Sequence, residues 1–128
     1  MNIELILQQL DTLFAEHKVY QVEDFLKNKI YEAAEEGDRN SVITLMNELI
    51  GHFRETGEFD KAIEYCEQVI VLMKKMGLEG SVAYATTLLN VANAYRAAGL
   101  LRESMAAFQT VQSIYEGNIS YHDFRYAS

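Results

Sequence analysis

Apolar residues recur along most of the chain at the spacing of a single helical face. Between Met46 and Phe53 they fall at i, i+3, i+4 and i+7, and the same spacing returns between Leu88 and Tyr95. This spacing is typical of amphipathic helices that bury one side. The pattern predicts six helices, over about residues 2–16, 20–36, 38–56, 59–76, 81–98 and 101–116.

Glycine marks the predicted end of several of these helices. Gly37, Gly57 and Gly99 each follow an apolar stripe, and glycine readily takes the left-handed conformation that ends a helix. The chain has no proline and only 7 glycines, which favours long helices joined by short turns. Gly117 and Asn118 predict one more turn, followed by a seventh helix that begins at Tyr121 and is cut short.

The helical pattern repeats with a fixed offset. The segment from Gly57 to Ala62 has a counterpart 42 residues later, from Gly99 to Ser104. A fixed period of this size indicates a solenoid, in which stacked copies of one small unit share a continuous core. The two units carry matching motif residues, which are Met46, Leu49, Ile50, Phe53, Gly57, Ala62 and Cys66 in one and Leu88, Val91, Ala92, Tyr95, Gly99, Ser104 and Phe108 in the other.

These residues resemble the tetratricopeptide repeat (TPR), in which a helix with large, small and aromatic apolar positions is followed by a turn glycine and a second helix. The 42-residue period is similar to the longer repeats of kinesin light chains and bacterial relatives. The resemblance implies an all-α, right-handed superhelical stack of antiparallel helical hairpins, with about six helices and a partial seventh. One domain would then span 1–128, with a degenerate repeat at 1–40, repeats at 41–78 and 79–118, and the start of a truncated repeat at 119–128.

The resemblance also implies a function. Members of the family mostly bind peptides or protein segments along a concave groove, so we expect a non-enzymatic protein–protein interaction scaffold. Two alternatives stay open at this stage. One is a structural oligomerisation module, and the other is the peptide-sensing regulatory part of a larger protein.

A polar stripe beside the apolar one supplies the groove residues that the resemblance implies. Asparagine amides suit the backbone of an extended peptide, and arginine suits carboxylates. The alternatives are that these side chains are solvated, that Arg54 pairs with Glu58, or that Asn90 bonds between adjacent helices. Gly51 lies in the same stripe, where close helix packing is the favoured explanation and room for a ligand is the other. The predicted groove residues are Thr44, Asn47, Arg54, Thr86, Asn90, Asn93 and Arg96.

Charge and composition narrow the classes of partner. The net charge is −8, and residues 1–40 carry 9 acids against 4 bases, which disfavours nucleic acid and an anionic membrane surface. No apolar run approaches the ~18 residues of a membrane-spanning helix. The start lacks a basic segment followed by an apolar core, so we expect no signal peptide and a cytoplasmic protein.

Little in the chain suggests catalysis or a bound cofactor. Glu48, His52 and Glu55 share a helical face and could ligate a metal, although such sets are mostly solvated. Cys66 is the only cysteine and falls on an apolar stripe, which favours a buried, unreactive thiol. We therefore predict no catalytic residue, no metal and no cofactor.

The end of the chain is rich in aromatic residues. Tyr121, Phe124 and Tyr126 follow the last complete repeat, and a solenoid needs a polar cap at its end. An uncapped end would leave an apolar patch. We therefore expect these three residues to support self-association as a homodimer through the C-terminal end.

Overall fold

The structure, a computed structural model, describes the backbone of residues 1–127 and the side chains of residues 1–118. Within this part the chain forms helices joined by short turns, and no strand is present. The elements are α1 (Ile3–Ala15), a short 3₁₀ turn η1 (Val19–Gln21), α2 (Val22–Glu35), α3 (Arg39–Thr56), α4 (Phe59–Lys75), α5 (Val82–Ala97) and α6 (Leu101–Ala127).

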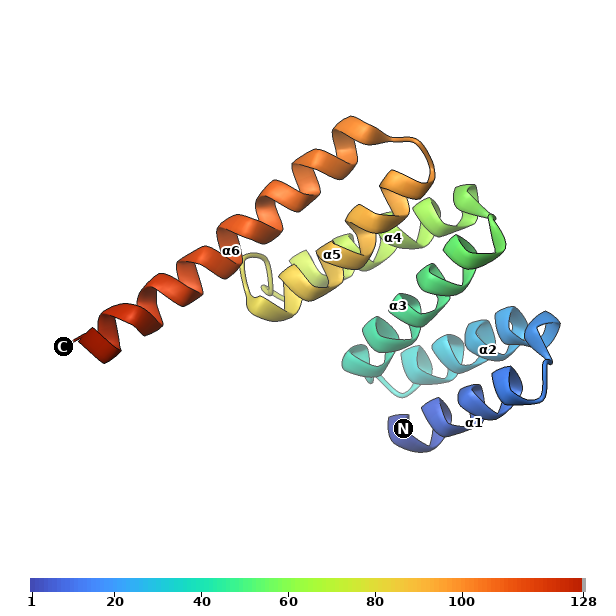
Figure 1. The fold of residues 1–128 in the computed structure, drawn as a ribbon. Coiled ribbons are helices and arrows are strands. Elements are labelled where there is room, and N and C mark those ends of the chain that lie inside the picture. The colour runs from blue at the N-terminus through green and yellow to red at the C-terminus, as the bar shows by residue number, and fades with distance from the viewer. Residues whose placement is uncertain (128) are drawn as a thin grey trace.

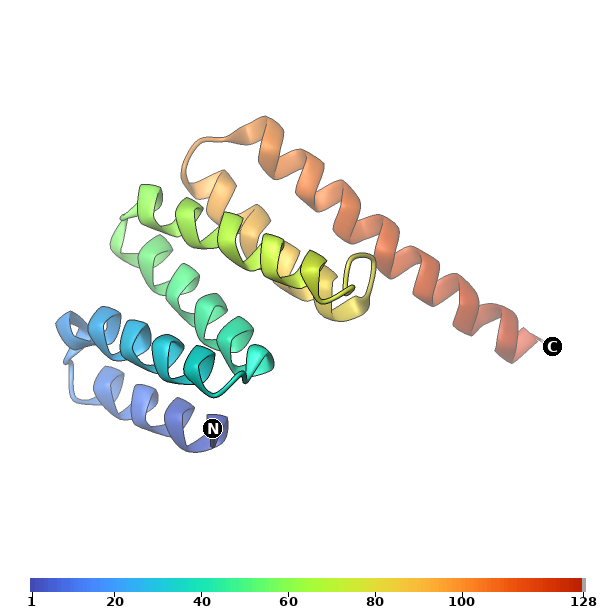
Figure 2. The same cartoon turned by 180° about the vertical axis from the view of Figure 1, so that it is seen from behind.

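Successive helices pair as antiparallel hairpins, and the hairpins stack side by side (Figure 1). The pairs are α1 with α2, α3 with α4 and α5 with α6, and the stack is held by contacts of α2 with α3, α3 with α5 and α4 with α5. Seen from behind, α4 lies in front of α5 (Figure 2). The first helices of the second and third hairpins therefore share one face of the stack, while α4 covers the other.

The predicted apolar stripes form one continuous core. Phe53 is fully buried and lies 5.9 Å, between ring centroids, from Tyr65 on the partner helix of its hairpin. Burial of a side chain of this kind contributes about 1.5–3 kcal/mol. The apolar motif residues of the second repeat are all buried, as the repeat pattern predicts: Met46, Leu49, Ile50, Phe53, Ala62 and Cys66.

The turns that join the helices share one hydrogen-bond pattern. Gly57 and Gly99 both take positive φ, +81° in each case. The backbone N–H of the residue after each glycine then donates to a carbonyl five residues earlier, from Glu58 to Phe53 and from Leu100 to Tyr95, both at 2.9 Å. This arrangement satisfies carbonyls that a helix end leaves free. The glycines thus fix where each hairpin turns.

The first hairpin has the same turn without a glycine. His17 takes φ 58°, and the N–H of Lys18 donates to the carbonyl of Leu13 at 2.8 Å. The unit at 1–40 therefore keeps the hairpin geometry although its turn residue departs from the repeat pattern. Left-handed backbone is unfavourable for a residue with a Cβ atom, so this turn is strained relative to the others.

Polar residues cap the starts of three helices. The side-chain oxygens of Asn2, Asp38 and Ser81 accept the backbone N–H of the residue three positions later, at 3.1, 3.2 and 3.1 Å. Each cap contributes about 1 kcal/mol to helix stability.

The predicted turn at Gly117 and Asn118 is wrong, and so is a separate seventh helix from Tyr121. Helix α6 continues through both positions to Ala127. Gly117 keeps a helical backbone, and the Asn118 side chain donates to the Ile114 carbonyl at 2.8 Å. One glycine costs a helix only about 1 kcal/mol relative to alanine, so it does not end a helix by itself.

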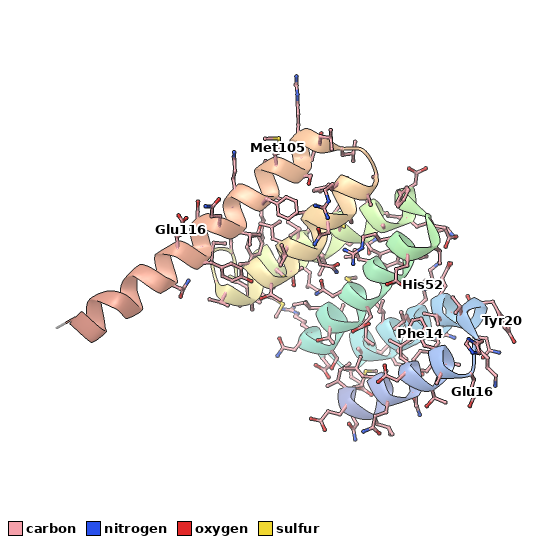
Figure 3. The ribbon with its side chains drawn as sticks, in the orientation of Figure 1. Phe14, Glu16, Tyr20, His52, Met105 and Glu116 are labelled. Atoms are coloured by element: carbon pink, nitrogen blue, oxygen red, sulfur yellow. The ribbon has the colours of Figure 1, made fainter. Side chains whose placement is uncertain are left out.

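Apolar spacing along 101–116 predicts that Met105 faces inward, together with Phe108 and Val111, and for Met105 this is wrong. Its side chain is 62% exposed, on the side of α6 that faces away from α5 (Figure 3). The buried residues of α6 are instead Ser104, Ala107 and Val111, and the Ser104 hydroxyl donates to the Ala92 carbonyl at 3.0 Å. Small residues let α6 lie close to α5, which turns the neighbouring methionine outward.

Two expectations from the sequence concern surfaces. Tyr121, Phe124 and Tyr126 lie outside the residues with described side chains, so their part in self-association stays a prediction. Among the described residues, no helix is both long enough and apolar enough to cross a membrane.

We expect His17→Gly to stabilise the fold by about 0.5–1 kcal/mol, because glycine takes the left-handed conformation without the cost that a Cβ atom brings. Urea unfolding followed by circular dichroism measures the change. Gly57→Ala is the matched control and should destabilise the fold. A His17→Gly variant that is less stable than the parent would show that the histidine side chain contributes more than its backbone costs.

Candidate functional site: a concave groove

A hollow of about 670 Å³ runs across the first helices of the three hairpins. Its lining residues come from α1, α3 and α5, and α3 contacts α5 directly. This volume is within the usual range for ligand sites, about 300–1,000 Å³. The lining residues are Phe14, Thr44, Asn47, Glu48, Gly51, His52, Arg54, Glu55, Thr86 and Asn90.

Two asparagines connect α3 to α5 along the floor of this groove. The Asn90 amide nitrogen donates to the backbone carbonyl and to the Oδ1 atom of Asn47, both at 3.1 Å. The Asn47 amide nitrogen donates to the carbonyl of Ile43 and to Oγ1 of Thr87, both at 3.0 Å. Both amides therefore already use their hydrogen-bond donors within the protein.

Arg54 extends this row of hydrogen bonds and keeps free donors. Its Nη1 atom donates to Oδ1 of Asn90 at 3.3 Å. A guanidinium has five N–H groups, so most of them stay available to a ligand. Glu58, the alternative partner of Arg54, instead accepts hydrogen bonds from the Thr56 hydroxyl at 2.8 Å and from the Lys61 ammonium at 3.1 Å.

Five of the seven predicted groove residues line this hollow: Thr44, Asn47, Arg54, Thr86 and Asn90. The other two, Asn93 and Arg96, do not. Arg96 donates to Asn93 at 3.2 Å, and its guanidinium lies over the ring of Phe108, 5.8 Å from the centroid. These two residues continue the polar stripe along α5 beyond the hollow.

Gly51 leaves open space in the groove. An added Cβ atom would meet nothing within 4 Å, and the backbone is helical. The favoured explanation from the sequence, close helix packing, is therefore wrong. Glycine inside a helix costs about 1 kcal/mol relative to alanine, and packing in the described structure does not offset that cost.

Phe14 and His52 line the hollow but lie outside the predicted polar stripe. Apolar spacing along residues 2–16 predicts that Phe14 is buried, yet it is 39% exposed and lines the groove. His52, which the sequence suggests only as a metal ligand, is nine-tenths buried and lies in the same corner (Figure 3). Phe14 is three residues before the left-handed His17, as Arg54 is before Gly57. That alignment of turns is the signal that identifies it.

Glu48 occupies the position in α3 that Asn90 occupies in α5, nine residues before the left-handed glycine. In α1, Leu7 occupies the position that Asn47 occupies in α3, and its side chain has no amide group that could form hydrogen bonds. Glu48 has no side-chain hydrogen bond or ion pair among the described residues. Its pKa is raised, first because nearby protein removes water from the carboxylate and then because of the Asp11 carboxylate. Its side chain remains exposed, since the groove is open on one side.

The chemistry of the described residues gives little support to catalysis. No group of three or more His, Cys, Asp and Glu side chains in this part of the chain could hold a metal ion, so Glu48, His52 and Glu55 do not converge. Burial raises the pKa of the Cys66 thiol to about 12. The thiol is therefore protonated at neutral pH, which makes it a poor nucleophile.

Fold and groove together define an α-solenoid of helical hairpins with a concave surface. A family model described as "Tetratricopeptide repeat" matches residues 41–117, more than half of the sequence. The chain therefore belongs to the tetratricopeptide repeat family. Repeats of this family generally mediate protein–protein interactions.

Two solved structures with the same fold come from Podosopora anserina. One, described as "putative kinesin light chain nearly identical TPR-like repeats", has a TM-score of 0.78 at 19% identity over 91% of this chain and 56% of that chain. A single-residue variant of the same protein gives 0.80 at 18% identity, over 92% and 57%. The chain thus spans just over half the length of these structures, and the likeness confirms the fold. No curated protein matches the sequence.

We expect Glu48→Gln to stabilise the fold near neutral pH. The folded-state pKa of Glu48 lies above its ordinary value, so the charged form is penalised in the folded protein. As the pH falls through the folded pKa, the carboxyl takes up a proton and the penalty disappears. The melting temperature of Glu48→Gln should therefore exceed that of the parent at about pH 7.5, and the two should converge at about pH 4. An equal difference in melting temperature at both pH values would contradict a raised pKa of Glu48 in the folded protein.

Proposed function

We propose that this protein is a non-enzymatic interaction module that holds an extended peptide or protein segment in the groove across α1, α3 and α5. The supporting observation is the open hollow of about 670 Å³ on the concave side of a TPR stack. Concave faces of solenoids are their common binding surfaces. Family membership supports a protein partner in general, and the groove supports this particular surface.

The lining of the hollow suits a chain in extended conformation. Arg54 supplies spare N–H donors for backbone carbonyls or a carboxylate, and His52 supplies a ring nitrogen. Gly51 leaves a gap in the wall of α3 where a backbone can approach closely. The asparagines have another role, since they hold α3 against α5. They shape the groove and offer a ligand their remaining acceptor sites.

We further propose that the chain is a TPR protein of the longer-repeat variety. The left-handed glycines that end α3 and α5 lie 42 residues apart, and the similar solved structures carry TPR-like repeats of a kinesin light chain.

Blocking the groove at Gly51 tests this proposal. A library of random twelve-residue peptides displayed on phage is panned against the immobilised protein, and recovered peptides are titrated by fluorescence anisotropy. We expect Gly51→Leu to weaken their binding at least about tenfold, because the side chain fills space that the peptide needs. Circular dichroism melts show whether each variant remains folded.

The chain offers a matched control for this substitution. Gly117 is also a helical glycine with nothing within 4 Å of an added Cβ atom, and it lies on α6, outside the groove. Gly117→Leu should leave the affinity unchanged. Equal affinity of Gly51→Leu and the parent, or recovery of no peptide at all, would remove the groove as the binding surface.

A further inference from the structure

Three carboxylates near α1 have no ion-pair partner among the described residues. Glu48 and Glu55 line the hollow two turns apart on one face of α3, and Asp11 lies on α1. Lys18 pairs with Glu16, the N-terminal amine pairs with Glu36 and Asp38, and Arg54, which also lines the hollow, donates to Asn90 on α5. Repulsion from Asp11 contributes to the raised pKa of Glu48, so the two carboxylates are close enough to interact.

His52 provides an independent indication of a ligand in this corner. Its side chain is nine-tenths buried and makes no hydrogen bond to a described residue. In the described part of the chain, every fully buried side-chain nitrogen or oxygen has a hydrogen-bond partner. Because the ring nitrogens of His52 have no such partner, they are not fully buried, and they reach the groove that His52 lines. An imidazole nitrogen that reaches the groove and has no partner among the described residues is available to a bound molecule.

Phe14 adds an apolar surface of the right kind. It lies three residues after Asp11 on the same face of α1, lines the hollow and is 39% exposed overall. The face of an aromatic ring attracts a cation through its quadrupole. A ring, two carboxylates close enough to interact and a third carboxylate two turns along α3 together match a long cationic side chain, whose alkyl stem covers the ring while its charge meets the acids.

We propose that this corner takes a lysine or arginine side chain of the bound segment, an inference that rests on the groove function proposed above. Charge complementarity selects this occupant over an acidic or neutral segment, since the corner is anionic and the whole chain carries −8. The backbone of the segment then runs from the Phe14 corner past Gly51 towards Arg54. His52 pairs with a backbone group of the segment.

The test uses the peptides recovered by panning. We expect basic residues to be enriched at one position, and replacement of that residue by glutamine to weaken binding. Glu48→Gln should weaken the basic peptide about fivefold, the value for an ion pair worth about 1 kcal/mol. It should leave the glutamine-substituted peptide unchanged. Glu64→Gln, which removes an exposed carboxylate on α4 outside the groove, is the matched control and should change neither affinity.

A charge exchange makes the test independent of any small effect of Glu48→Gln on stability. Glu48→Lys should reject the basic peptide and bind its glutamate-substituted version more tightly than the parent does. Peptides that need an open Gly51 but show no basic preference, or that bind Glu48→Gln and the parent equally, would overturn this inference and leave the groove function intact. Insensitivity to Gly51→Leu would overturn both.

Discussion

The row of hydrogen bonds from Asn47 through Asn90 to Arg54 is the constraint on which the concave surface depends. Two partly buried amides at the α3–α5 contact must find partners, because a buried amide without one costs about 1–3 kcal/mol. They find them in each other and in neighbouring backbone and hydroxyl groups. The apolar core makes the hairpins stack, and this row of hydrogen bonds determines how α3 and α5, the first helices of two hairpins, face each other. The floor of the groove has its shape as a result.

The row cannot continue to the first hairpin. Aligned by the left-handed turns, Leu7 takes the place of Asn47 and Glu48 takes the place of Asn90, so neither amide is available between α1 and α3. The groove is therefore uneven. Between α3 and α5 it is closed by satisfied amides, and beside α1 it is open, acidic and lined by Phe14 and His52. A charged group held where protein removes part of its water is unfavourable for the folded state and is common at functional sites.

Much of the fold follows from local patterns in the sequence. Helical spacing at Met46–Phe53 and Leu88–Tyr95 and turn glycines at 57 and 99 determine the hairpins, because each rests on interactions within one unit. The errors arise where contacts between units decide. Met105 points outward because Ser104 and Ala107 let α6 approach α5, and Gly117 stays helical because one glycine seldom ends a helix. Phe14 and His52 belong to the groove through the placement of α1 against α3, which periodicity within one helix does not encode.

A double-mutant cycle on Asn47 and Asn90 tests the central constraint most directly. Asn47→Ala, Asn90→Ala and the double variant are unfolded in urea, and the free energies of unfolding are compared with that of the parent. We expect the two losses in free energy of unfolding not to be additive, with a coupling of about 1–2 kcal/mol, because each amide loses the partner that the other residue supplies. Losses that add to within about 0.3 kcal/mol would show that the two side chains act independently. The groove floor would then need another explanation.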